Sequence, residues 1–188
     1  MMTQLQALEV LARKRSGQMV VTTMSSAGIW PKLSDSPLDF HYIPSAMGHA
    51  TDLGLGLALA HPQRGAFVLN GDGCMLMNLG SLVTLASQKA NVLLIILDNG
   101  LYEVTGGQPI PGARQIDFAN LARAAGIQHV FSFDALEQWQ AGVDEVLNGP
   151  RPAVVWLKVE GRLGQQTPKP PRPLKEQIES LQKALGVC

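Results

Sequence analysis

The sequence predicts one α/β domain, a doubly wound and mainly parallel sheet with helices on both faces. Three observations predict it. Short apolar strands alternate with stretches of helical periodicity. The most compact apolar run, Val92–Leu97, suits a strand that is buried on both faces. Polar, glycine-rich clusters follow two of the strands, at the edge where such sheets bind their ligands.

The first third of the chain supplies one helix, three strands and a second helix rich in small residues. Apolar residues at helical spacing from Leu5 to Ala12 predict the first helix, which Gly17 ends. Strands are expected at 19–23, 40–43 and 66–70. The helix expected over 45–60 is rich in Gly and Ala, and each Gly costs about 1 kcal/mol relative to Ala. We expect a close approach to a neighbouring element or a ligand to compensate for this cost.

The rest of the chain continues the alternation and then changes character. Helices are expected near 78–90, 118–125 and 135–147, and strands at 92–97, weakly around Val130, and at 153–159. Glycines and prolines make residues 106–112 a long loop. Four prolines between 168 and 173 indicate a stiff linker before an amphipathic helix over 174–185. We therefore expect a domain over residues 1–161, and a linker with a terminal helix over 162–188.

Composition excludes several classes of function. Fifteen basic residues balance fifteen acidic ones, so no global charge recruits nucleic acid or an anionic membrane. No apolar run approaches the roughly 20 residues of a membrane-spanning helix, and the N-terminus lacks the apolar stretch of a signal peptide. Cys74 and Cys188 lie far apart and have no zinc-binding spacing, which favours a reduced cytoplasm.

Two polar clusters, Gly71–Gly73 and Asp98–Gly100, each end an apolar strand, and one helix separates them. Glycines beside Asp72 let the backbone approach a ligand closely, and a helix start behind it favours phosphate. An aspartate beside phosphate needs a cation between them, and magnesium prefers oxygen ligands such as Asp72 and Asn99. Each cluster alone is an ordinary turn signal. Together they predict a magnesium–phosphate site.

A dinucleotide-binding loop is the competing phosphate motif. Gly54 and Gly56 have the spacing of its first two glycines. They lie inside a helical stretch rather than just after a strand, and the third glycine is absent. We reject this alternative.

The segment from Gly71 to Gln108 resembles the diphosphate-binding motif of thiamine-diphosphate enzymes, which begins with Gly-Asp-Gly and ends near Asn-Asn. Asp98 replaces the first of the two asparagines, and Asn99 keeps the second. The resemblance implies that magnesium binds Asp72, Asn99 and the carbonyl oxygen of Leu101. It also implies that the backbone of Gly73 and Cys74 contacts the diphosphate. Cys74 otherwise fills the loop as a small residue, and we prefer that to a redox role.

A second segment, Ser45–Gly48, resembles the stretch beneath the folded cofactor in these enzymes. In the family a bulky apolar residue there holds the two rings in a bent conformation, and Met47 fits this role. Backbone groups of Ser45 and Met47 are then expected to bind the aminopyrimidine. The alternative for Met47 is a buried residue at the start of a core helix. Ser25, after the first strand, resembles a hydroxyl residue that contacts the diphosphate.

The fullest resemblance is to the sulfopyruvate and phosphonopyruvate decarboxylases, through MGHA, GDG, MNLGSL, DNG and TGGQ, and more loosely over residues 17–160. It implies a subunit that uses thiamine diphosphate and magnesium to decarboxylate an anionic 2-oxo acid. Residues 1–161 would be its diphosphate-binding domain. His49 is a candidate for proton transfer or a structural residue at a helix start. The loop Thr105–Gln108 is a candidate lid over substrate or a plain turn.

In the family, a glutamate on a separate pyrimidine-binding domain starts the proton relay on the cofactor. None of the chain's glutamates, Glu103 among them, matches that site. We therefore expect a partner chain that supplies this glutamate, in a hetero-oligomer or, for the chain alone, a homodimer. The helix over 174–185 is a candidate contact surface or an ordinary core helix. Two other functions stay open: another carbon–carbon lyase or ligase such as an acetolactate-synthase-like enzyme, and a non-catalytic module that binds cofactor or partner.

Overall fold

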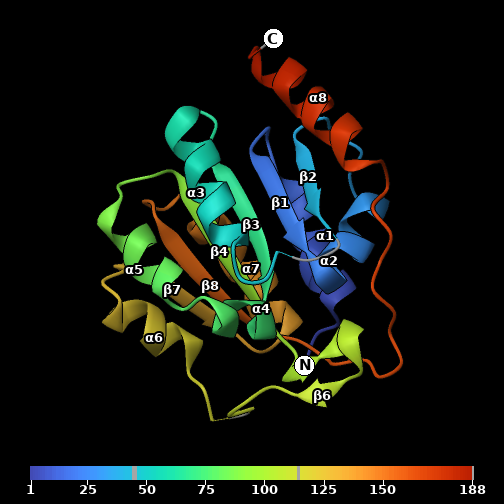
Figure 1. Ribbon diagram of the computed structural model, residues 1–188. Helices are drawn as coiled ribbons and strands as arrows, with labels where there is room; N and C mark the ends of the chain where they lie inside the picture. Colours follow the sequence, from blue (N-terminus) through green and yellow to red (C-terminus); the bar gives the residue numbers. More distant parts are fainter. Residues whose placement is uncertain (44–45, 114, 188) are drawn as a thin grey trace.

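A computed structural model describes residues 1–43, 46–113 and 115–187 and shows an α/β domain built around a six-stranded parallel sheet (Figure 1). The strand order is β2-β1-β3-β4-β8-β7. The strands are β1 (Met19–Thr23), β2 (Asp39–Tyr42), β3 (Ala66–Gly71), β4 (Val92–Asp98), β7 (His129–Phe133) and β8 (Ala153–Lys158). A small antiparallel hairpin, β5 (Leu101–Tyr102) with β6 (Gln108–Pro109), follows β4.

Helices cover both faces of this sheet (Figure 1). They are α1 (Gln4–Lys14), α2 (Met24–Ile29), α3 (Ala50–Ala60), α4 (Asp72–Met77), α5 (Gly80–Ser87), α6 (Phe118–Ala124), α7 (Leu136–Asn148) and α8 (Leu174–Leu185), with 3-10 turns η1 (Trp30–Lys32) and η2 (Glu103–Thr105). Within the described residues, no helix combines the length and the apolar character needed to cross a membrane.

Alternate residues of the central strands enter two separate cores, which is the mark of a sheet buried on both faces. In β4, Leu94 and Ile96 join the core under α3, α5, α6 and α8, whereas Leu93 and Ile95 join the core under α1 and α7. All four side chains are fully buried. The predicted fold class is confirmed, and the continuous apolar runs that predicted it are explained by this double burial.

Two helix starts differ from the sequence prediction, and one short helix was not predicted. α4 begins at Asp72, directly after β3, rather than near residue 78. α3 begins at Ala50 rather than at residue 45, because the chain first passes through positive φ at Met47 and Gly48. The short helix α2 follows β1, where no element was predicted. The first turns of α3 and α4 consist mostly of polar or small residues, which carry no apolar periodicity.

The small residues of α3 permit the close approach that the sequence predicted. A Cβ on Gly54 would lie 2.2 Å from the Val68 side chain of β3, so only glycine fits at this contact. Gly56, two residues on, faces open space and has no such constraint. One of the glycines therefore compensates for its cost in helix propensity by letting α3 lie directly on the sheet.

The terminal helix α8 packs against the edge strand β2 (Figure 1). Leu181 enters the core, and the side-chain oxygen of Gln177 accepts a hydrogen bond of 2.8 Å from the backbone N–H of His41. Gln177 is 2% exposed. Of the two expectations for this helix, the structure supports a packing role on the sheet edge. The division of the chain near residue 161 stays a prediction.

Candidate functional site

A pocket opens at the carboxyl ends of β1, β3 and β4. The chain leaves β1 toward the outer strand β2 and returns to β3, so the crevice between β1 and β3 is the switch point of the strand order, where doubly wound sheets bind ligands. The empty space, open mouth included, is about 660 Å³. Among the predicted site residues, those that line the pocket are Ser25, Met47, Asp72, Gly73, Cys74, Asn99 and Leu101.

The carboxylate of Asp72 joins the two polar clusters. Its Oδ1 accepts a hydrogen bond of 2.7 Å from the backbone N–H of Gly73, and its Oδ2 accepts one of 2.6 Å from the backbone N–H of Gly100. Strands β3 and β4 are neighbours in register, with Gly71 opposite Leu97. The two polar clusters, which the sequence predicted to share one site, therefore meet at the neighbouring ends of β3 and β4.

Asp72 lies beside a second carboxylate. Burial, followed by the hydrogen bond and the negative charge of Asp98, raises the pKa of Asp72 from 3.8 to about 8, although the backbone hydrogen bonds from Gly73 and Gly100 work in the opposite direction. Asp98 is itself held by Trp156, whose indole N–H donates to Oδ2 at 2.9 Å. Asp72 is 2% exposed. A cation at this position would offset the repulsion between the two carboxylates, so the local electrostatics suit a metal ion.

The described residues fit magnesium by their chemistry. Asn99 lines the pocket, and its side-chain oxygen accepts a hydrogen bond of 2.9 Å from the backbone N–H of Leu101. Asp72, Asn99 and a main-chain carbonyl would form the oxygen set that magnesium prefers, with phosphate oxygens completing it. Within the described residues, no group of three or more His, Cys, Asp or Glu side chains forms a metal site. The predicted ligand set therefore depends on amide and main-chain oxygens.

Gly73 and Gly71 differ in what surrounds them. A Cβ on Gly73 would lie 2.5 Å from the ring of Tyr102, so glycine lets the hairpin β5–β6 pack against the start of α4. A Cβ on Gly71 would meet no atom within 4 Å. Because Gly71 lines the pocket, its missing side chain leaves space in which a ligand can approach the backbone.

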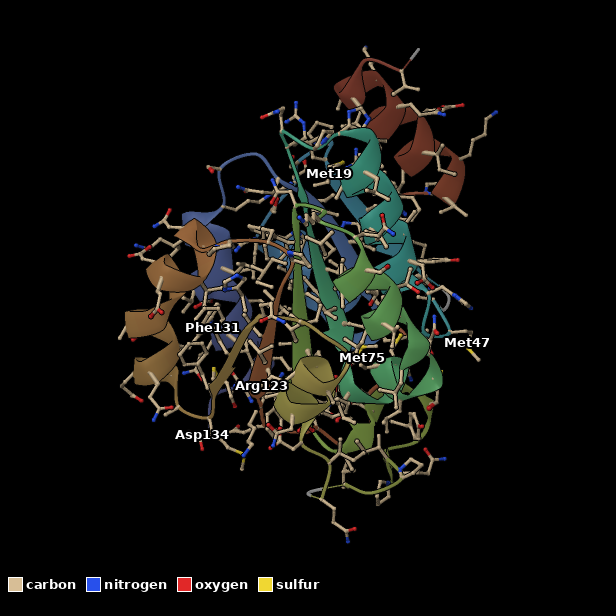
Figure 2. All side chains as sticks on the ribbon, turned by 90° about the vertical axis from the view of Figure 1, so that its left-hand side faces the viewer. Met19, Met47, Met75, Arg123, Phe131 and Asp134 are labelled. Atoms are coloured by element: carbon tan, nitrogen blue, oxygen red, sulfur yellow. The ribbon has the colours of Figure 1, made fainter. Side chains whose placement is uncertain are left out.

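Met47 lies at the periphery of the molecule, in contrast to the core residue Met75 (Figure 2). Met47 is 59% exposed and has φ of +43°, so the alternative of a buried core methionine is wrong. Gly48 follows with φ of +90°, and its N–H donates to the sulfur of Cys74 at 3.3 Å. The backbone here is turned to present Met47 at the pocket. Ser45 lies outside the described residues.

Cys74 is a buried thiol in the pocket wall. Burial raises its pKa, and hydrogen bonds from Gly48 and Thr23 offset part of that rise. A thiol with a raised pKa is a poor nucleophile and a poor redox group at neutral pH. This agrees with the preferred interpretation of Cys74 as a small residue that fills the loop.

Gly48 and His49 are not among the described residues that line the pocket. The His49 ring lies next to Asp52, with 2.9 Å between Nδ1 and the carboxylate, and its side chain is 64% exposed. Asn78 donates to the same carboxylate at 2.9 Å. Asp52 thus holds Nδ1 of a side chain that is mostly exposed. A catalytic role for His49 stays a prediction.

Glu103 is a pocket residue for which the sequence predicted no role. Its side chain is 6% exposed, and its Oε2 accepts hydrogen bonds from the Ser25 hydroxyl at 2.6 Å and from the Gln4 amide at 3.1 Å. Its Oε1 accepts the backbone N–H of Arg162 at 2.6 Å. One feature of the sequence could have identified Glu103 as a site residue: it is a charged residue that comes just after the second polar cluster, at the end of a strand.

The loop Thr105–Gln108, a candidate lid or a plain turn, begins within this wall. Thr105 ends η2 and lines the pocket, and Gly106 and Gly107 follow with φ of +131° and +75°. Gln108 then pairs with Tyr102 in the hairpin. The segment is an ordered turn in this structure, and its closure over a substrate stays a prediction.

Comparison with known proteins agrees with this geometry. The profile of the family described as "Thiamine pyrophosphate enzyme, C-terminal TPP binding domain" matches residues 16–157. The chain is 36% identical over 144 residues to the sulfopyruvate decarboxylase subunit beta of Methanothermobacter thermautotrophicus, covering 75% of this chain and 76% of that one. It is 35% identical over 160 residues to the phosphonopyruvate decarboxylase of Streptomyces viridochromogenes, covering 84% of this chain and 40% of that one.

A solved structure shows the same fold. The thiamine diphosphate-dependent 4-hydroxybenzoylformate decarboxylase of Rhodococcus jostii RHA1 superposes with a TM-score of 0.67 at 20% identity, over 87% of this chain and 33% of that one. The chain therefore spans 40% of this phosphonopyruvate decarboxylase and 33% of the 4-hydroxybenzoylformate decarboxylase, but 76% of the sulfopyruvate decarboxylase subunit beta. On the profile match and the paired strand-end clusters, the chain belongs to the thiamine pyrophosphate enzymes, and it carries their C-terminal cofactor-binding domain.

Proposed function

We propose that the chain is the diphosphate-binding subunit of a decarboxylase that uses thiamine diphosphate and magnesium on an anionic 2-oxo acid of the sulfopyruvate or phosphonopyruvate kind. The proposal depends above all on the hydrogen bond that Gly100 donates to Asp72, where the ends of β3 and β4 meet beside the pocket. It brings both halves of the diphosphate motif into one pocket. The two relatives above, both at about 35% identity, are named for these two substrates.

In this proposal the residues of the chain hold and orient the cofactor. Asp72, Asn99 and the carbonyl oxygen of Leu101 would hold the magnesium, and the backbone of Gly73 and Cys74 would contact the diphosphate. When bound, thiamine diphosphate supplies the carbon that adds to the 2-oxo group and the ring that stores the electron pair left by carbon dioxide. The residues that line the pocket would hold and orient this cofactor.

The proposal includes a partner chain that supplies the pyrimidine-binding half and the activating glutamate. Exposed apolar side chains at the pocket support it, because Met47 is 59% exposed and Met77 is 49% exposed, and both line the pocket. Large apolar side chains beside a ligand site commonly mark a protein interface. The beta-subunit relative is named as one subunit of its enzyme.

A reconstitution experiment tests the activity. The full chain is mixed with a pyrimidine-binding partner subunit, magnesium and thiamine diphosphate, and carbon dioxide release is followed with sulfopyruvate, phosphonopyruvate and pyruvate. We expect release from an anionic 2-oxo acid, and loss of release with Asp72→Ala. Condensation of two 2-oxo acids instead would favour an acetolactate-synthase-like reaction, and inactivity with a folded, cofactor-loaded complex would leave a binding module.

A further inference from the structure

The carboxylate of Glu103 faces Ser25, the predicted diphosphate contact, and the proposed reaction gives this carboxylate no role. Its three donors come from α1, α2 and the chain after β8: the Gln4 amide, the Ser25 hydroxyl and the Arg162 backbone N–H. A second contact lies next to it, where the Thr167 hydroxyl donates to the carbonyl oxygen of Val104 at 3.3 Å. One buried side chain thus ties the start of the molecule and the linker to η2.

Ser25 and Glu103 cannot keep this contact when a diphosphate binds at Ser25. A serine hydroxyl has one proton to donate, and Glu103 takes it in this structure. Diphosphate oxygens have only lone pairs to offer, so they need the same proton. A carboxylate at hydrogen-bond distance from that serine also repels the diphosphate, and the repulsion is weakly screened because the Glu103 side chain is buried. The two contacts are mutually exclusive.

We propose that Glu103 is a latch on the cofactor pocket, closed in the ligand-free chain and opened when a diphosphate takes the Ser25 hydroxyl. The Glu103 latch means the Glu103 carboxylate with Gln4, Ser25 and the backbone N–H of Arg162. The inference rests on the proposed function and on the predicted contact between the Ser25 hydroxyl and the diphosphate. Opening removes the acceptor of the Arg162 N–H, so cofactor binding loosens the start of the linker.

A released carboxylate has cations close by. Lys32 and Arg162 line a hollow that shares Ser25 and Glu103 with the cofactor pocket. Both cationic residues are exposed, so their side chains are able to turn toward the carboxylate. If the Glu103 carboxylate moved from the pocket into this hollow, it would exchange its contact with Ser25 for a contact with a positive charge. The open state therefore has a stabilising interaction of its own.

Calorimetric titration of the full chain with magnesium and inorganic pyrophosphate, and with magnesium and thiamine diphosphate, tests the latch. Glu103→Gln removes the charge and keeps the shape, and the matched control Glu160→Gln removes an exposed charge nearby. We expect Glu103→Gln to bind pyrophosphate about tenfold more tightly than wild type, because the repelling charge is gone, and Glu160→Gln to bind like wild type.

Hydrogen exchange of wild type supplies a second measurement that needs no substitution. We expect magnesium and pyrophosphate to raise exchange at the Arg162 amide, while Asp72 and Gly100 become more protected. Pyrophosphate that binds without faster exchange at Arg162, or equal or weaker binding by Glu103→Gln, would overturn the latch and leave the cofactor site standing. Binding of pyrophosphate by Glu103→Gln but not by the wild type would support the latch. Failure of both proteins to bind either ligand would overturn the proposed cofactor site, and the latch with it.

Discussion

Replacement of Asp72 by asparagine is expected to stabilise the ligand-free chain while it removes magnesium-dependent cofactor binding. The carboxylate is buried beside Asp98, and its pKa is raised from 3.8 to about 8. Between these two pH values the folded chain holds a proton that the unfolded chain has released. The stability of the wild type therefore falls as pH rises through this window, by about 1.4 kcal/mol per pH unit at most.

Near pH 7 the raised pKa of Asp72 lowers the free energy of unfolding of the wild type by on the order of 4 kcal/mol. Asparagine keeps the size of the side chain, but its amide group must face one of the two N–H groups, of Gly73 or Gly100, that the carboxylate accepts. Such a mismatch costs about 1–3 kcal/mol. The expected net gain is about 2 kcal/mol at pH 7, or roughly 5 °C in Tm for a chain of this size. Near pH 5 the two effects cancel.

The assay is urea and thermal unfolding of wild type and Asp72→Asn at pH 5, 6, 7 and 8. The matched control is Asp134→Asn, because Asp134 is an exposed carboxylate at the surface (Figure 2). Magnesium with thiamine diphosphate should then raise the Tm of wild type and of the control, and leave the Tm of Asp72→Asn unchanged. A stability difference that does not widen from pH 5 to pH 8 would refute the reasoning about the buried pair.

Three further predictions concern the pocket wall and the sheet edge. Gly73→Ala should lower the free energy of unfolding by about 1–3 kcal/mol, because the added Cβ must displace the Tyr102 ring. Gly71→Ala should change it by less than about 0.5 kcal/mol. Equal losses for the two variants in urea unfolding would contradict the close contact at Gly73. Burial lowers the pKa of His41. The unfolded chain therefore binds a proton at His41 more readily than the folded chain, and the free energy of unfolding should fall as the pH drops below 6.5. This fall should be smaller in His41→Gln, which is checked by following unfolding from pH 7 to pH 5. Gln177→Ala should lower the free energy of unfolding by about 1–3 kcal/mol and speed proteolysis of the linker over 162–173, because the backbone N–H of His41 loses its acceptor. The control is Lys175→Ala, at an exposed position of the same helix. Equal cleavage rates for the two variants would show that the docking of α8 does not depend on the hydrogen bond between Gln177 and His41.

The sequence predicted those parts of the site that depend on strand ends. Apolar runs locate β3 and β4, and a parallel sheet places the ends of neighbouring strands together, so Asp72 and Asn99 had to lie on one edge. Met47 and Ser25 were located by resemblance, because a turn with positive φ and a six-residue helix leave no periodic pattern.

What the sequence did not predict depends on contacts between distant segments. Glu103 meets Gln4 across 99 positions and Arg162 across 59, and no spacing in the chain records such a meeting. The early start of α4 follows from the same limit, because Asp72 serves at once as the first residue of a helix and as the acceptor for Gly100. Tertiary hydrogen bonds, rather than local propensity, decide both features.

The placement of the two chain ends has a practical consequence for any tagged or fused version of the protein. The N-terminus lies beside the β5–β6 hairpin, close to the pocket, while the carboxyl end of α8 lies at the far end of the molecule (Figure 1). Met2 forms a bridge with Val159, and Gln4 touches Glu103. Bulky additions before Met1 would therefore crowd the cofactor entrance, and affinity handles are better attached after α8.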